Sequence, residues 1–110
     1  MSNISPGSAA FYILLILTQG ERHGYAIMKE VTILSENTVN LGPATLYTTL
    51  KNLLEATIIQ ENTPRSDDTH PRPNERRRYY SLTAIGKQRI ETELEFLQRV
   101  LIKFNPKTSI

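Results

Sequence analysis

A short basic segment of the sequence carries the side chains most suited to binding phosphate. Between Arg72 and Tyr80 there are four arginines and one acidic residue, and three of the arginines are consecutive. Guanidinium groups make charge-assisted hydrogen bonds to phosphate, and each contact with DNA also releases counterions. The formal net charge is only +2, so the basic segment stands out on a nearly neutral chain. We expect at least one of Arg76, Arg77 and Arg78 to contact phosphate, and the alternative is a solvated charge run.

Other kinds of chemistry have little support in the sequence. There is no cysteine, and the two histidines, His23 and His70, have no second ligand at a known metal-binding spacing. No nucleophile is arranged with a base, no glycine-rich phosphate loop occurs, and no pair of carboxylates falls in apolar sequence. We therefore expect no enzyme, no cofactor and no metal. His23 precedes a predicted helix, where a cap or turn role is the simplest account.

A helix predicted to begin at Pro43 offers a second polar surface. Proline suits the first helical position because the backbone N–H at that position has no partner within the helix, so its absence in proline costs nothing. The predicted core stripe is Leu46, Leu50, Leu53 and Leu54. The side chains away from that stripe are Thr45, Thr48, Thr49, Lys51 and Asn52. Tyr47 falls at the edge of the stripe, where its ring would pack while its hydroxyl reaches a phosphate.

Hydrophobic periodicity predicts the elements that must position these residues. Helices are expected over about residues 8–19, with Ser8 as cap, 24–36, from 43 onward, and 84–104, with Thr83 as cap. Two strands, 58–62 and 77–82, are predicted to form a hairpin whose connection is longer than an ordinary hairpin turn. Tyr79 and Tyr80 alternate in the second strand, so one of them is expected in the core.

The last predicted helix has more apolar surface than its own domain requires. Its apolar residues recur at spacings of 4, 3, 4 and 3, which is the pattern of a seam between two helices. This predicted dimerisation seam is Ile90, Leu94, Leu97, Leu101 and Phe104. Phe96 and Val100 widen the apolar face, so we expect inner contacts with the first helix and outer contacts with a second copy of the chain.

Three helices, a hairpin and a final helix predict a mostly α fold with a small β-hairpin, namely a winged helix-turn-helix domain. In that arrangement the third helix enters the major groove of double-stranded DNA. We expect a DNA-binding domain over residues 1–83 and a dimerisation helix with a short tail over 84–110. The longest apolar run has nine residues, whereas a membrane span needs about 20, and residues 1–8 carry no lysine or arginine. The expected location is cytoplasmic and nucleoid-associated, with no membrane contact.

Three motifs in order resemble the PadR-like family of transcriptional regulators. Residues 20–25 are similar to that family's His-Gly-Tyr opening of the second helix. Residues 42–47 resemble its Pro-x-Thr-Leu-Tyr opening of the recognition helix. Residues 76–86 resemble its basic, aromatic wing strand and the Leu-Thr-x-x-Gly start of the last helix.

The resemblance implies a winged-helix repressor that binds a two-fold-symmetric operator as a homodimer and is released by a small aromatic or drug-like effector. Carried over by position, the DNA-binding residues on the recognition helix and the wing are Pro43, Ala44, Thr45, Tyr47, Thr48, Lys51, Arg76, Arg77 and Arg78. Phe11, Tyr12 and Phe96 are the aromatic candidates to line an effector pocket.

The sequence departs from the family pattern at three positions. Gly42 stands where a serine cap is common, Thr48 where an arginine is common, and Thr57 where a glycine commonly ends the third helix. Thr48 cannot make the bidentate guanine contact of an arginine. Together with the low net charge, this departure supports an alternative function, a protein-interaction module that binds no operator.

Overall fold

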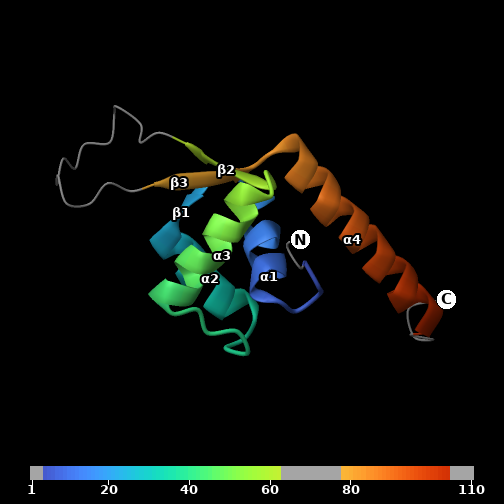
Figure 1. The fold of residues 1–110 in the computed structure, drawn as a ribbon. Helices are drawn as coiled ribbons and strands as arrows, with labels where there is room; N and C mark the ends of the chain where they lie inside the picture. The colour runs from blue at the N-terminus through green and yellow to red at the C-terminus, as the bar shows by residue number, and fades with distance from the viewer. Residues whose placement is uncertain (1–3, 63–77, 105–110) are drawn as a thin grey trace.

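A computed structural model describes residues 4–62 and 78–104 (Figure 1). Its elements are α1 (Ala9–Leu17), β1 (Arg22–His23), α2 (Gly24–Leu34), α3 (Pro43–Glu55), β2 (Ile59–Asn62), β3 (Tyr79–Leu82) and α4 (Ala84–Phe104). The predicted mostly helical fold with a small sheet is confirmed, and α4 has the bounds expected from the sequence. No helix in the described part of the chain is both long and apolar enough to cross a membrane.

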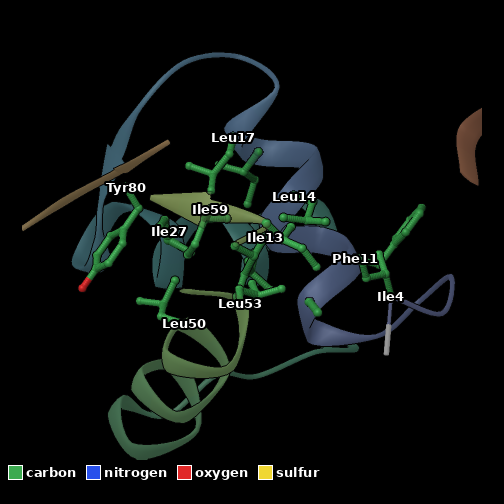
Figure 2. Packing of buried hydrophobic residues seen from close by; sticks show 14 of the residues in the cluster. Ile4, Phe11, Ile13, Leu14, Leu17, Ile27, Leu50, Leu53, Ile59 and Tyr80 are labelled. Carbon is green, nitrogen blue, oxygen red and sulfur yellow. The ribbon is translucent and has the colours of Figure 1, made fainter. Parts of the chain in front are cut away.

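The α1 helix is the centre of the hydrophobic core, as its apolar sequence predicted. Ser8 caps it, because the Ser8 hydroxyl accepts a hydrogen bond of 3.1 Å from the amide of Phe11. Six of its nine residues are buried, and Ile13 and Leu14 are completely so. Figure 2 shows these side chains converging with Ile27 of α2 and Leu53 of α3. Each fully buried side chain of this size stabilises the fold by about 1.5–3 kcal/mol.

The α2 and α3 helices are joined by a turn that is ordered by a buried serine. His23 caps α2 through Nδ1, which accepts a hydrogen bond of 3.2 Å from the amide of Ala26, so its predicted structural role is confirmed. At the other end, the Ser35 hydroxyl accepts a 3.0 Å hydrogen bond from the amide of Val39. Gly42 makes no side-chain cap for α3, which agrees with the weak cap expected there. The side-chain hydrogen bonds that order the turn between α2 and α3 therefore come from Ser35, at the end of α2, and not from Gly42, at the start of α3.

The α3 helix ends in a Schellman motif with threonine in the left-handed position. Thr57 has φ of 57°, and its amide donates to the carbonyl of Leu54 while the amide of Ile58 donates to the carbonyl of Leu53. Leu53 and Ile58 are both buried, which supplies the apolar contact that accompanies this motif. The geometry usually favours glycine, so the threonine holds a conformation that is costly for a β-branched residue.

The sheet has three strands in the order β1-β3-β2, all antiparallel. The sequence predicted β2 and β3 but not β1, because a strand of two residues shows no alternation. In β1, Arg22 lies opposite Tyr80 and His23 opposite Tyr79. Tyr80 is buried and Tyr79 is only half-buried, with its ring edge-on to that of His23. The expectation of one core tyrosine is confirmed for Tyr80, whereas Tyr79 is partly covered by His23 and not fully exposed.

The α4 helix is anchored at its first turn and then runs away from the sheet (Figure 1). The Thr83 hydroxyl accepts a 3.0 Å hydrogen bond from the amide of Gly86 and lies 2.6 Å from the carbonyl oxygen of Thr57. A Cβ atom at Gly86 would overlap the carbonyl oxygen of Ile58, so only glycine allows α4 to approach this closely. Ile90, one turn further, is completely buried in the protomer's own core. It is therefore not available for the exposed dimerisation seam in which the sequence placed it.

Replacing Thr57 by glycine is predicted to stabilise the protein by about 1 kcal/mol. The left-handed backbone costs a β-branched residue roughly 1–2 kcal/mol, and glycine avoids this cost. Part of the gain is lost because glycine has the greater conformational entropy in the unfolded state. Urea unfolding monitored by circular dichroism measures the change. The control is Thr48→Gly, which lies inside α3 and should destabilise by roughly 0.3 kcal/mol, the difference between the helix propensities of threonine and glycine. A Thr57→Gly midpoint equal to or below that of the wild type would show that the conformation is not strained.

Candidate nucleic-acid interface

The α3 helix presents a continuous polar face to solvent. Its leucines at positions 46, 50 and 53 are buried, which turns the remaining side chains outward. The exposed residues of this α3 face are Pro43, Ala44, Thr45, Tyr47, Thr48 and Lys51. These are the residues that the sequence assigned to the recognition helix, and the structure brings them together on one side of one rigid element.

Tyr47 joins the α3 face to the start of α2. Its side chain is 55% exposed, yet its hydroxyl lies 3.2 Å from where a Cβ atom would stand on Gly24. The absence of a side chain at Gly24 thus makes room for the phenol at the α2–α3 contact. The Tyr47 ring and hydroxyl therefore pack on the start of α2, while about half of the residue stays exposed to solvent.

Within the predicted wing, the structure describes one of the three candidate arginines. Arg78 is exposed and lies at the start of β3, where its Nε is 3.7 Å from a carboxylate oxygen of Glu61 on β2. An exposed ion pair of this length adds little stability. Arg78 can therefore exchange Glu61 for another anion, such as a phosphate. Arg76 and Arg77 lie outside the described residues.

The base of the wing is tied to the helices by polar contacts that the sequence did not predict. The Asn62 side-chain amide of β2 donates to Glu21 at 2.6 Å and to the hydroxyl of Ser81 at 3.1 Å. On β1, at the other edge of the sheet, Arg22 pairs with Glu30 of α2 at 3.1 Å. Asn62 and Glu21 are 41 residues apart, so local sequence patterns carry no signal for the contact. These contacts fix the wing strands to the segment that leads into α2.

Tyr80 lies beneath this network with its ring in the core and its hydroxyl pointing away from it (Figure 2). Burial raises the pKa of the Tyr80 phenol above its ordinary value of 10.0, and the Glu61 carboxylate and Tyr47 raise it further, whereas Arg78 lowers it. The phenol therefore stays neutral at physiological pH and acts as an apolar ring with a polar edge.

An apolar groove of about 560 Å³ lies beside α4. Its lining residues are Leu15, Ile16, Thr18 and Gln19, then Glu30, Ile33 and Leu34, and finally Leu94. The three aromatic residues that the sequence proposed for an effector pocket do not line this groove. Phe11 is buried with its ring edge-on to that of Tyr12, and Phe96 is exposed on α4.

The second half of α4 carries exposed apolar side chains. Of the predicted seam, Leu94, Leu101 and Phe104 are exposed, Phe104 by 76%, and Leu97 packs partly against the core. Ile102 and Phe96 are also exposed. The seam therefore divides into an inner part that belongs to the protomer and an outer part that faces solvent.

Comparisons with known proteins give one consistent result. The model of the transcriptional regulator PadR-like family matches residues 13–92. The fold is similar to a PadR family transcription regulator from Clostridium difficile R20291, with 29% identity, a TM-score of 0.66, and coverage of 89% of this chain and 98% of that one. It is also similar to Bacillus subtilis PadR, solved in complex with operator DNA, with 23% identity, a TM-score of 0.65, and coverage of 82% and 48%. An uncharacterized protein X from Lysinibacillus sphaericus is 28% identical over 86 residues, which is 78% of this chain and 74% of that protein.

Proposed function

The chain belongs to the transcriptional regulator PadR-like family, and from this membership we propose that it is a repressor that binds a two-fold-symmetric operator as a homodimer. Members of the family are transcriptional regulators rather than enzymes. The observation that carries the proposal is the α3 face, a polar surface held outward by three buried leucines. A helix held in this way fits the major groove, and the strands beside it stand where a wing meets the DNA backbone.

The side chains of the α3 face are better suited to contacts with phosphates and thymine methyl groups than to hydrogen bonds with base edges made by long side chains. Lys51 supplies a cation and Tyr47 a hydroxyl for phosphate oxygens. Thr45 and Thr48 are short, and their methyl groups suit contact with thymine methyls. The threonine at position 48 thus changes how the groove is read without removing the surface that reads it. DNA shape is expected to carry a larger share of the specificity than in relatives with an arginine there.

We predict that Lys51→Ala weakens binding to the chain's own promoter fragment and lowers the slope of log affinity against log salt concentration by about 0.9, the value for one lost phosphate contact. Fluorescence anisotropy across a salt series measures both. Lys87→Ala is the matched control, because Lys87 is an exposed lysine on α4. Wild-type affinity for the promoter no greater than for bulk competitor DNA would refute operator binding and would favour the protein-interaction alternative.

The proposal of a homodimer is supported by the outer face of α4. Leu101 and Phe104 are large apolar side chains in water, and contiguous surfaces of this kind mark interfaces with other proteins. A two-fold interface brings the same surface of each copy together, so one apolar helix face per protomer is sufficient. The dimer would space its two α3 helices by about one turn of DNA, roughly 34–36 Å.

Leu101→Glu is predicted to produce a monomer, because it places an unpaired charge in the apolar interface. Light scattering after size-exclusion chromatography measures the mass. The control is Thr92→Glu, which introduces the same charge at an exposed position on the opposite face of α4. Circular dichroism should show unchanged helix content in both variants, since neither side chain is in the core. A monomeric wild type, or a dimeric Leu101→Glu variant, would contradict dimerisation through this face.

We also propose that a small aromatic effector releases the operator by binding in the groove beside α4. The volume of the groove is in the range of small-molecule sites, and most of its lining is apolar. Glu30 stands at this groove and also pairs with Arg22 of β1, which is hydrogen-bonded to the wing strand β3. An occupant that displaces Glu30 would therefore act on the strand that positions the wing.

Planar aromatic compounds are predicted to raise the melting temperature of the wild type and to lower the fraction of operator bound. Ile33→Asn should reduce both effects, because Ile33 lines the groove while being 70% exposed, so that its replacement leaves the core intact. Thermal shift and gel-shift assays over a compound series provide the measurement. No shift with any compound, or equal shifts in wild type and Ile33→Asn, would count against a site in the groove.

A further inference from the structure

Of the four lysine and arginine side chains in the described winged-helix part, two form ion pairs with carboxylates and two do not. In residues 4–62 and 78–82, Arg22 pairs with Glu30 and Arg78 pairs with Glu61. Within the described residues, no carboxylate forms an ion pair with Lys29 or Lys51. Lys51 belongs to the α3 face. Lys29 lies on α2, and the function proposed above gives it no role.

Lys29 is accompanied by an exposed aromatic ring. Tyr25 is one turn earlier on α2, so the two side chains share a face, and the Lys29 ammonium lies 5.9 Å from the centroid of the Tyr25 ring. Tyr25 is 63% exposed, although a ring of this size is usually more buried. The pair therefore presents one cation and one hydroxyl to solvent, with the motion of the long lysine side chain reduced by the ring.

The position of this pair relates it to the α3 face. Glu30 and Leu34 line the groove beside α1 and α4, and the helical rotation turns them by about 100° or more around α2 from Tyr25 and Lys29. Ile33, one turn after Lys29, lies at the border of the groove. Gly24, the residue next to Tyr25, packs against Tyr47 of the α3 face. The surface thus continues from α3 through Tyr47 onto the first turns of α2.

We propose that Tyr25 and Lys29 contact a phosphate of the DNA backbone at the border of the groove that α3 enters. The inference rests on the proposed operator binding and extends it to a second helix. The first helix of a helix-turn-helix crosses the backbone, which places an exposed cation on α2 within reach of a phosphate. The Lys29 ammonium pairs with the phosphate charge, and the Tyr25 hydroxyl donates a hydrogen bond to a phosphate oxygen. The contact fixes the register of α3 and is independent of base sequence.

The test measures the salt dependence of binding to the promoter fragment and to an unrelated duplex. Lys29→Ala is expected to lower the slope of log affinity against log salt by about 0.9, which is roughly an eightfold loss at 0.1 M salt relative to 1 M. The loss should be the same for both duplexes, because a phosphate contact does not depend on sequence. Tyr25→Phe should retain the ring beside Lys29 and lose a smaller factor than Tyr25→Ala. The matched control is again Lys87→Ala, with no change in slope.

The outcomes separate this inference from the function on which it rests. If Lys51→Ala lowers the slope but Lys29→Ala leaves it at the wild-type value, α2 makes no phosphate contact and operator binding through α3 stands. Such a result would point to an acidic protein surface as the partner of Tyr25 and Lys29. A wild type with no salt-dependent affinity for any duplex would overturn both. Melting temperatures equal to that of the wild type ensure that each variant is folded.

Discussion

The burial of most of α1 in the core is the interaction on which the other features depend. Ile13 and Leu14 are excluded from water by residues of α2, α3 and the sheet together, so each of these elements must turn an apolar side inward. For α3 that requirement uses Leu46, Leu50 and Leu53, and it leaves the polar side facing outward. The α4 helix meets the same core through Ile90 and, in part, Leu97, and its outer apolar side chains stay exposed. The candidate DNA surface and the candidate dimer surface are both consequences of how α1 is covered.

Features with a local physical cause could be predicted from the sequence. The leucine spacing of α3, the capping roles of Ser8 and His23, and the start of α4 after Thr83 all depend on residues within one or two turns of each other. Features formed by distant residues could not be predicted. The short strand β1, the Arg22–Glu30 pair and the Asn62–Glu21 hydrogen bond arise only when the chain has folded. Ile90 fits the spacing of the seam but is buried, because periodicity gives the apolar side of a helix and not what covers it.

The departures from the family pattern have different consequences for fold and for recognition. Thr57 adopts the left-handed conformation that a glycine would take more easily, and the helix end keeps both of its hydrogen bonds. The fold therefore tolerates the change at a cost in stability. Thr48 lies on the exposed face of α3, where the fold does not constrain which residue is present. Only binding to a ligand could constrain it. Similarity of fold thus extends across this family to chains that need not share an operator.

Gly86 packs directly on the carbonyl oxygen of Ile58 and so attaches the first turn of α4 to the winged domain. A helix attached at its first turn acts as an arm about 30 Å long. Turning such an arm by about 10° displaces its far end by about 5 Å, which exceeds the rise of one base pair of DNA, about 3.4 Å. In a dimer held at the far ends of two such arms, small adjustments of the helix pair would set the separation of the two α3 helices. The spacing between the two half-sites of the DNA would then be determined by the contacts between the far ends of the two α4 helices.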